Sequence, residues 1–261
     1  MLPLSRIVVV ATMLEPPRGF EWARQGRIVM LIRSDVRSWV EPALRAPASG
    51  APADPMRRLD GGRGGAEVIA VAGHEMVLRA FRRGGLPARV LHDTYCGWSP
   101  RPFRELCVTE ALRARGAPVV DVYGACVQWL FWGCYKGWIA TRYIRDAHTL
   151  WQWIAAAPPA AERTLVLQAV GKAIRRLHDS GGTHPDLNLN NILIQPTDAA
   201  RGFEVLLIDF DRAPVARRFH RQADADLTRL RRSARKLDPH GRCVTVADLQ
   251  CLETAYHEVF G

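Results

Sequence analysis

The amino-acid sequence predicts an α+β fold in two lobes, in which strands and one helix precede a mostly helical second half. Two apolar runs framed by glycines lie near residue 70, and a strongly amphipathic stretch covers Glu162–His178. The length of 261 residues accommodates one large domain or two small lobes around a single cleft. Hydrophobic residues make up 48% of the chain and charged residues 24%, which is typical of a folded protein and not of a disordered or fibrous one.

The first 58 residues are expected to form an N-terminal extension and linker. The first 41 contain no recognisable motif, and Glu41–Asp54 is rich in Pro, Ala and Gly, which favours a linker or long loop. The apolar patch Ile7–Leu14 is short for a signal peptide, and no convincing small-residue cleavage site follows it. We therefore place the first lobe at 59–143 and the second at 144–261.

In the first lobe, Val68–Val71 and Met76–Leu78 flank a turn and predict a β-hairpin that follows a glycine-rich segment. Pro102–Arg115 has apolar residues at helical spacing and is followed by a glycine, which predicts a helix. The apolar stretch Val122–Tyr135 is shorter than the ~20 residues that a membrane span needs, so two adjacent strands are expected there. Strands are predicted at Val119–Tyr123 and Trp138–Ile144.

In the second lobe, Glu162–His178 places its apolar residues on one stripe and ends before two glycines, so it is expected to be a helix. Short strands are predicted at Asn191–Ile194 and Val205–Ile208. The rest of the chain has a helical and strongly basic pattern. This order of elements gives the mostly helical second lobe.

The chain is strongly basic. It has 36 Lys+Arg against 26 Asp+Glu, a net charge of +10, and lysine is absent before Lys136. A pI near 9.9 predicts an anionic partner, which could be nucleic acid, nucleotide phosphates, an acidic glycolipid or a membrane surface. The 6 cysteines form no CxxC pair, so neither a zinc site nor a disulfide is indicated, and reduced thiols in the cytosol are expected.

The segment HPDLNLNNILI at His184–Ile194, followed by LIDFD at Leu207–Asp211, carries the chemistry. Phosphoryl transfer needs one carboxylate to orient the attacking hydroxyl, and an amide oxygen and a second carboxylate to hold Mg²⁺. Asp186 and Asn191 supply the first two on a loop that leads into a strand, and Asp209 supplies the third at a strand end. Asp and Asn also form ordinary loops. The loop motif with Asp186 and Asn191, followed by the strand-end motif with Asp209, matches the protein-kinase-like catalytic signature.

Together with VLRAFRRGG upstream and DLTRLRRSARKL downstream, the blocks GGTHPDLNLNNILI and LLIDFDR resemble the lipopolysaccharide kinase family, and most of all its 3-deoxy-D-manno-octulosonic acid (Kdo) kinases. The resemblance runs from about Asp60 to about Pro239. It implies a protein-kinase-like fold, with a small antiparallel-sheet N-lobe carrying one helix and a mainly helical C-lobe. It also implies ATP- and Mg²⁺-dependent phosphorylation of a Kdo hydroxyl on the lipid A–Kdo precursor of the lipopolysaccharide inner core. The implied location is the cytoplasmic face of the bacterial inner membrane, as a peripheral protein.

Arg79 lies where kinase-like folds place the lysine that grips the α- and β-phosphates of ATP. Because no lysine precedes Lys136, an arginine must bind these phosphates, and its guanidinium can do so through two parallel hydrogen bonds. Arg82 and Arg83 are alternatives for this role. Glu105, on the helix that follows, is the candidate partner of Arg79, and Glu110 is its alternative.

Three glycines complete the predicted nucleotide site, and one histidine is expected to support the catalytic loop. Gly62, Gly64 and Gly65 would let the backbone approach the triphosphate, although a glycine-rich turn alone is a weak signal. His184 is expected to hold the catalytic loop by hydrogen bonds. A surface arginine on a strand and a solvated helix face remain the simpler interpretations of Arg79 and Glu105.

The catalytic motif departs from that of protein kinases at Asn188, which replaces the usual lysine, and at Asp211, which replaces the usual glycine. Both departures resemble small-molecule and glycan kinases. The chain ends 52 residues after Asp209, which leaves little room for an activation segment and a peptide-binding platform. A protein substrate is therefore not expected.

The segment 212–236 contains nine Lys or Arg against two aspartates. Arg212, Arg229 and Arg232 are weak candidates for binding the acceptor, a Kdo-bearing lipid A precursor at an anionic leaflet, where each basic residue contributes ~1 kcal/mol. A merely solvated basic helix is the alternative. Nucleic acid is no longer an expected partner.

Three rival functions remain open. A heptose kinase of the same superfamily would ignore acceptors that carry Kdo alone, and an aminoglycoside-type kinase would phosphorylate a soluble substrate. An inactive pseudokinase would bind anionic glycolipid without catalysis, which intact Asp186, Asn191 and Asp209 argue against.

Overall fold

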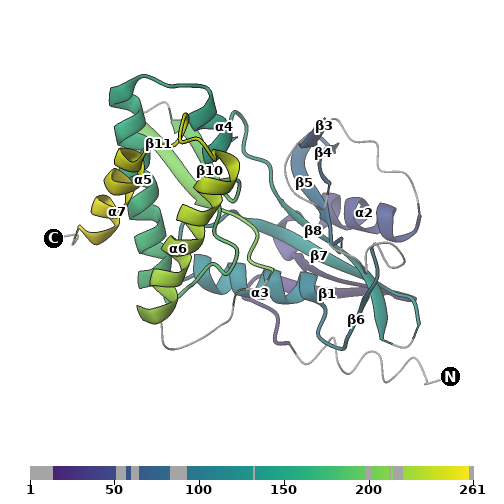
Figure 1. The fold of residues 1–261 in the computed structure, drawn as a ribbon. Helices are drawn as coiled ribbons and strands as arrows, with labels where there is room; N and C mark the ends of the chain where they lie inside the picture. Colours follow the sequence, from purple (N-terminus) through teal and green to yellow (C-terminus); the bar gives the residue numbers. More distant parts are fainter. Residues whose placement is uncertain are drawn as a thin grey trace. The chain divides into compact units, whose positions relative to one another are not determined.

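The structure is a computed structural model that describes residues 14–50, 57–59, 65–82, 93–131, 133–197, 202–211, 213 and 220–258. The predictions for Gly62, Gly64, Arg83 and Arg212 lie outside the described residues. The chain forms two compact units (Figure 1). Unit 1 consists of Met1–Glu110 and Asp121–Tyr143, and unit 2 of Ala111–Val120 and Ile144–Gly261.

Unit 1 is built on an antiparallel sheet with strand order β1-β2-β7-β8-β5-β4-β3, and β6 pairs with β8. Its helices are α2 (Arg37–Ala48), preceded by the 3-10 turn η1 (Ser34–Val36), and α3 (Arg101–Arg113). The strands are β1 (Phe20–Gln25), β2 (Ile28–Arg33), β3 (Arg57–Leu59), β4 (Ala66–Val71), β5 (His74–Ala80), β6 (Tyr95–Cys96), β7 (Val122–Trp129) and β8 (Cys134–Arg142).

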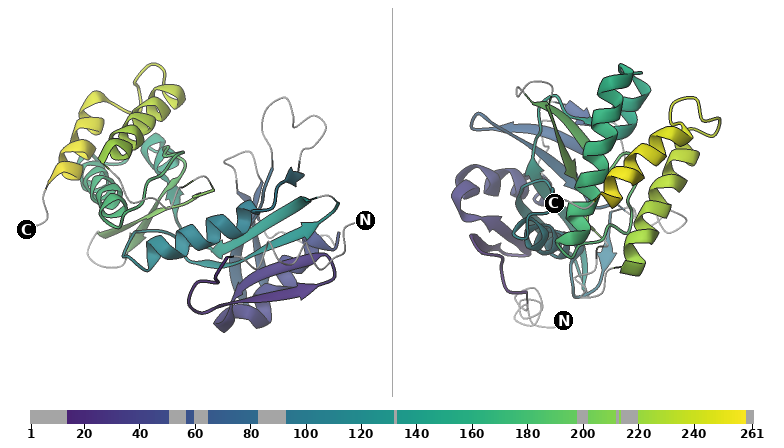
Figure 2. Two further views of the ribbon diagram at one scale, coloured as in Figure 1. Left: turned by 90° about the horizontal axis from the view of Figure 1, so that it is seen from below. Right: turned by 90° about the vertical axis from the view of Figure 1, so that its left-hand side faces the viewer.

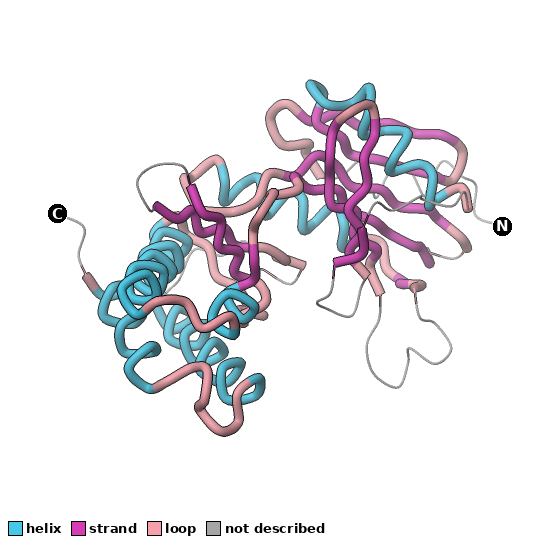
Figure 3. The backbone as a smooth tube through the Cα atoms, turned by 90° about the horizontal axis from the view of Figure 1, so that it is seen from above, coloured by secondary structure: helices cyan, strands magenta, loops and turns pink. Residues whose placement is uncertain are grey.

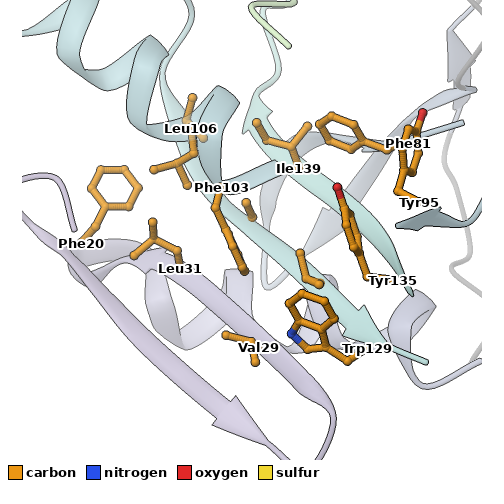
Figure 4. Packing of buried hydrophobic residues seen from close by; sticks show 13 residues of the cluster. Phe20, Val29, Leu31, Phe81, Tyr95, Phe103, Leu106, Trp129, Tyr135 and Ile139 are labelled. Carbon is orange, nitrogen blue, oxygen red and sulfur yellow. The ribbon is translucent and has the colours of Figure 1, made fainter. Parts of the chain in front are cut away.

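Both faces of this sheet are covered, because its central strands alternate between two apolar cores. On β2, Leu31 packs with Phe103 and Leu106 of α3 on one face, whereas Met30 packs with Leu44 of α2 on the other. Figure 4 shows the α3 face, where Phe103 and Leu106 meet Leu31 and Trp129 lies nearby. The sheet therefore fixes α3, and with it the residues that α3 carries, against β5 and β8.

The expected linker over Glu41–Asp54 is wrong for 41–48, which belong to α2. Val40, Ala43, Leu44 and Ala48 recur at helical spacing and are buried against the sheet. This burial outweighs the cost of two prolines inside the helix. The expected extension before residue 59 also contains β1 and β2, so these residues are part of the main sheet of unit 1.

Cys96 and Cys134 form a disulfide, so the expectation of reduced thiols is wrong for this pair. The two residues face each other across β6 and β8, with their Cα atoms 4.0 Å apart. Their juxtaposition comes from strand pairing and not from spacing along the chain. Cys107, Cys126, Cys243 and Cys251 are free thiols.

Unit 2 packs helices against a small sheet, as Figure 3 shows. The strand order of this sheet is β11-β10-β9. The helices α5, α6 and α7 lie side by side in Figure 2. The close approach of α5 and α7 requires Gly171, because a Cβ there would lie 2.2 Å from the Leu252 carbonyl oxygen. The elements are β9 (His148–Thr149), α4 (Leu150–Ala155), α5 (Ala160–Asp179), β10 (Ile192–Thr197), β11 (Gly202–Leu207), α6 (His220–Leu237) and α7 (Val246–His257).

Most elements predicted after residue 65 are confirmed, but the strand predicted at Val119–Tyr123 is wrong for 119–121, because β7 begins at Val122. The hairpin is β4–β5, the first helix is α3, and the apolar stretch 122–135 contains two adjacent strands, β7 and the start of β8. The amphipathic helix is α5, the short strands are β10 and β11, and the basic tail forms α6 and α7. In the described residues, no helix combines the length and the apolar character that crossing a bilayer requires.

Candidate active site

The loop between α5 and β10 carries Asp186 on a tightly bonded backbone. The side-chain amides of Asn188 and Asn191 both donate to the Asp186 carbonyl oxygen, at 2.8 and 2.9 Å. The Leu187 N–H donates to the His184 carbonyl at 3.0 Å, which closes a turn around Asp186. Leu187 and Leu189 are buried, while the side chain of Asp186 is exposed. The loop therefore presents the Asp186 carboxylate to solvent on a fixed backbone.

His184 joins this loop to the segment that carries Asp209. Its Nε2–H donates to the Ile208 carbonyl oxygen at 2.9 Å, and the Ile208 N–H donates to the Asn191 carbonyl at 3.1 Å. His184 is fully buried against the Phe210 ring, with ring centroids 4.6 Å apart. Burial lowers the pKa of His184, so the ring is neutral, and its hydrogen bond holds the catalytic loop to the segment before Asp209. The hydrogen bonds expected of His184 are present.

Asp209 directly follows Ile208 and has a left-handed backbone with φ of 70°. This conformation is uncommon for a residue other than glycine, and it persists only where the surroundings impose it. Here the bonds from Ile208 to both His184 and Asn191 hold the preceding residue in place. Asp186, Asn191 and Asp209 thus belong to one hydrogen-bonded assembly within unit 2.

Sequence reasoning missed the residue that anchors the loop. The carboxylate of Asp226 on α6 accepts hydrogen bonds from the His184 backbone N–H at 2.6 Å and from Arg229 Nη1 at 2.7 Å. His178 of α5 contacts the same carboxylate through Nε2 at 3.2 Å, and its Nδ1 lies 2.9 Å from the Tyr256 hydroxyl of α7. Asp226 is 1% exposed. A usable signal existed, because Asp226 falls on the buried stripe of α6, whose other members are Ala223, Leu227, Leu230 and Ala234.

The basic residues of α6 differ in their surroundings. Arg229 is half-buried by its ion pair with Asp226, and Arg231 pairs through two bonds with Glu253 of α7. Arg232 is exposed on the same helix. Of the candidate acceptor-binding arginines on α6, Arg232 is therefore the more open to solvent.

In unit 1, Arg79 of β5 and Glu105 of α3 form an ion pair. Arg79 Nη2 lies 2.5 Å from Glu105 Oε1 and 2.6 Å from Oε2, and its guanidinium lies 4.8 Å from the centroid of the Phe81 ring. Glu105 is buried, whereas the Arg79 side chain is 24% exposed. The predicted pairing of Arg79 with Glu105 is present, and part of the Arg79 side chain is exposed.

The alternatives to this pair have other surroundings. Glu110 is also buried on α3, and Arg82 is exposed after β5. Gly65 has φ of 62°, which favours glycine, and a Cβ there would lie 3.5 Å from the Arg82 guanidinium. The structure thus brings Arg79, and not Arg82, into contact with Glu105.

The donor set of unit 2 fits Mg²⁺. In the described part of the chain, no group of three or more His, Cys, Asp or Glu residues forms a metal cluster. Mg²⁺ bound with a nucleotide needs only one or two protein ligands, because phosphates and water complete its coordination. Asn191 donates through its amide nitrogen, which leaves the amide oxygen for a metal, and Asp209 adds a carboxylate.

The model of the Lipopolysaccharide kinase (Kdo/WaaP) family matches residues 50–256. The chain belongs to this family. Among curated relatives, the 3-deoxy-D-manno-octulosonic acid kinase of Xanthomonas oryzae pv. oryzae is 34% identical over 214 residues, which cover 80% of this chain and 82% of the relative. The enzyme of the same name from Xanthomonas campestris pv. campestris is 33% identical over 207 residues, 77% of this chain and 79% of the relative.

A solved structure described as "WaaP in complex with acyl carrier protein" has the same fold as this chain. It aligns with a TM-score of 0.57 over 88% of each chain, at 18% sequence identity. The two-lobed, protein-kinase-like α+β fold expected from the sequence is therefore confirmed, as is the resemblance to lipopolysaccharide kinases. The expectation of a single helix in the first lobe is wrong, because α2 accompanies α3 there. The chain is a phosphotransferase with an alcohol acceptor.

Proposed function

We propose that this lipopolysaccharide kinase transfers the γ-phosphoryl group of ATP to a Kdo hydroxyl on the lipid A–Kdo precursor. The observation that carries this proposal is the bonded assembly of Asp186, Asn191 and Asp209, which supplies the groups that phosphoryl transfer needs. The acceptor class is supported by the relatives, which are named Kdo kinases and are 33–34% identical over more than three quarters of this chain.

Asp186 orients the acceptor. Its exposed carboxylate accepts the hydrogen bond of the attacking Kdo hydroxyl, and its oxygen takes the proton as the new O–P bond forms. The bond between the γ-phosphorus and the bridging oxygen breaks, and ADP leaves with that electron pair. The fixed Asp186 backbone lowers the cost of placing this hydroxyl in line with the phosphorus.

The Asn191 amide oxygen and the Asp209 carboxylate would hold Mg²⁺. When bound, Mg²⁺ supplies charge neutralisation on the β- and γ-phosphates. Arg79 binds the α- and β-phosphates of ATP, and the buried Glu105 keeps its guanidinium oriented through two short contacts. Gly62, Gly64 and Gly65 remain candidates for backbone contacts to the triphosphate.

The acceptor lipid places the reaction at the cytoplasmic face of the inner membrane, with the kinase as a peripheral protein. The exposed Arg232 of α6 is a candidate contact for the acidic acceptor, together with Arg229 and Arg212. Proteins and nucleic acids are not proposed as substrates.

Release of ADP with a Kdo-bearing lipid A precursor tests this function. We expect Asp186→Asn to lower kcat by about 10²–10⁴-fold, because it removes the proton acceptor and leaves the backbone bonds in place. Asp179→Asn, which changes an exposed carboxylate at the end of α5, is the matched control and should retain full activity. Equal rates for wild type and Asp186→Asn would overturn the mechanism.

The choice of acceptor separates the rival functions. We expect phosphate transfer to lipid A that carries Kdo alone. Activity that appears only with heptose-bearing lipid A would identify a heptose kinase, and activity only with soluble aminoglycosides would identify a small-molecule kinase. Binding of Kdo–lipid A without binding of Mg²⁺-ATP would identify a pseudokinase.

A further inference from the structure

Two exposed aromatic side chains and two arginines gather at one end of the sheet of unit 1. Among the described residues of this unit, the exposed large apolar side chains are Trp98, at 45%, and Phe131, at 63%. Arg24 and Arg27 flank the β1–β2 turn and are also exposed. We call Arg24, Arg27, Trp98 and Phe131 the hairpin-tip patch.

One backbone hydrogen bond and one side-chain hydrogen bond place the two hairpin turns side by side. The Trp129 N–H donates to the Arg27 carbonyl at 2.9 Å, and Arg27 Nη1 donates to the Leu130 carbonyl at 2.9 Å. The β7–β8 turn closes through the Cys134 N–H, which donates to the Phe131 carbonyl at 2.7 Å. Phe131 is therefore held at a turn that touches the β1–β2 turn.

Trp98 joins this end of the sheet from the segment after β6. The Gly97 N–H donates to the Gly133 carbonyl at 2.9 Å, next to the disulfide between Cys96 and Cys134. The Trp98 ring lies over Gly133, where a Cβ would approach it to 3.3 Å. The disulfide and the glycine thus hold the indole at the β7–β8 turn.

The exposed rings lie outside an aromatic layer that is already packed. Trp129, Tyr135 and Tyr95 are 3%, 2% and 7% exposed, and Figure 4 shows them within the core beside α3. The Trp98 ring centroid is 6.3 Å from that of the buried Trp129 ring, and Trp98 itself is 45% exposed. Phe131 and part of Trp98 are exposed, and neither belongs to the buried cluster beside α3, so these surfaces are available to a partner.

We propose that the hairpin-tip patch docks the kinase on the surface of an anionic phospholipid bilayer. Tryptophan and other aromatic rings settle at the headgroup level of membranes, and arginines bind lipid phosphates through paired hydrogen bonds. Arg27 and Phe131 lie on two neighbouring turns, whose tips can enter a headgroup layer. Arg24 at the end of β1 and Trp98 in the segment after β6 lie beside these turns. The choice of a bilayer as occupant rests on the proposed function, because the acceptor there is a membrane lipid.

Flotation with vesicles, in the absence of ATP and acceptor, tests this docking separately from catalysis. We expect the wild type to float with vesicles of phosphatidylethanolamine and phosphatidylglycerol, but not with phosphatidylcholine vesicles. Arg24→Gln/Arg27→Gln should weaken the vesicle affinity roughly 30-fold, and Trp98→Ala/Phe131→Ala should weaken it at least as much. All variants should keep the wild-type thermal midpoint and their ADP release with detergent-dispersed acceptor.

Matched controls change equally exposed residues elsewhere. Leu165→Ala/Val246→Ala removes exposed apolar side chains of unit 2, and Arg18→Gln/Arg104→Gln removes exposed charges of unit 1, so both should float like the wild type. Patch variants that float like the wild type would overturn the proposal. It would also be overturned if only Arg232→Gln/Lys236→Gln on α6 abolished flotation, or if the patch variants lost binding to purified acyl carrier protein and not to vesicles.

Discussion

The carboxylate of Asp226 on α6 accepts a 2.6 Å hydrogen bond from the backbone N–H of His184, the residue that begins the catalytic motif. The same carboxylate contacts His178 of α5 and Arg229 of α6. His184 in turn donates to the Ile208 carbonyl, beside Asp209. A buried acidic side chain therefore links α5 and α6 to the backbone on which the catalytic loop and Asp209 depend.

Asp226→Asn should impair both stability and catalysis. The amide replaces one acceptor oxygen with a donor, which faces donors from Arg229 and from the loop in a buried site. We expect the free energy of unfolding to fall by about 1–3 kcal/mol, the cost of leaving a buried donor without its acceptor. At temperatures where the variant is folded, kcat should fall by a larger factor than the KM for ATP rises. The reason is that the position of the catalytic loop affects the stability of the transition state more than the binding of ATP.

Asp224→Asn is the control for this measurement, since Asp224 is exposed on the same helix two residues earlier. It should change the free energy of unfolding by less than about 0.5 kcal/mol. Urea unfolding and ADP release at saturating ATP measure the two effects. A folded Asp226→Asn protein with wild-type kcat would contradict the proposed positioning role.

Arg79→Ala should weaken the interaction with ATP. Loss of a charge-assisted hydrogen bond to phosphate is expected to lower kcat/KM for ATP roughly 10- to 100-fold. Arg79→Lys keeps the positive charge but loses the planar guanidinium that can form two parallel hydrogen bonds. Its kcat/KM for ATP should therefore lie between those of the alanine variant and the wild type. Because Arg79→Ala leaves the buried Glu105 carboxylate without this partner, the double variant Arg79→Ala/Glu105→Gln separates ATP binding from stability.

Arg82→Ala decides between the neighbouring arginines. Arg82 is exposed and lies beside Gly65. We expect it to retain at least about half of the wild-type kcat/KM for ATP, within the small effects typical of surface substitutions. A larger loss in Arg82→Ala than in Arg79→Ala would show that the phosphate-binding role belongs to Arg82.

Two contacts expected from the sequence are present, one from a short-range pattern and one from the family resemblance, while the roles of these residues stay predictions. Asp186 and Asn191 are five residues apart on one loop, and the spacing itself brings the Asn191 amide to the Asp186 carbonyl. The contact between Arg79 and Glu105 spans 26 residues and was expected because of the family resemblance. In both cases the residue types suit the proposed chemistry, since Asp and Asn bind hydroxyl groups and Mg²⁺, and Arg paired with Glu binds phosphate.

The features that were missed depend on tertiary packing. The Pro- and Ala-rich composition of α2 hid a helical stripe, and only burial of Leu44 and its neighbours against the sheet makes it stable. The disulfide of Cys96 follows from the register of β6 on β8. The position of Asp226 on the apolar stripe of α6 indicates burial, but its partners on α5 and on the catalytic loop depend on how α6 packs and not on local spacing.

Cys96→Ser should destabilise the oxidised protein. The disulfide with Cys134 closes a segment with a sequence separation of 38, and the chain-entropy model assigns about 4 kcal/mol to such a closure. Urea unfolding without reductant should show a loss of about 2–4 kcal/mol relative to the wild type. With dithiothreitol the two proteins should unfold alike. Cys251→Ser, at a free and partly buried thiol, is the control, and a wild type insensitive to reductant would contradict the bond.

Asp248 should make stability depend on pH in the acidic range. Burial alone would raise its pKa, but hydrogen bonds from Arg163 of α5 and from Thr245 outweigh burial and hold the pKa at about 2. The Arg163 bonds are 2.8 Å from Nε to Oδ1 and 2.7 Å from Nη2 to Oδ2. A carboxyl in the unfolded chain has a pKa of about 3.9, so the folded state favours the charged form.

The stabilisation from Asp248 is therefore complete above about pH 5 and is lost as the pH falls from about 4 toward 2. We expect the difference in free energy of unfolding between wild type and Asp248→Asn to be constant near neutrality and to shrink over this acidic window. Arg163→Gln removes the main donors to the carboxylate, so it should flatten the same pH dependence. Urea titrations at a series of pH values measure both variants. A difference that stays constant down to pH 2 would show that the Arg163 pair does not set the charge state of Asp248.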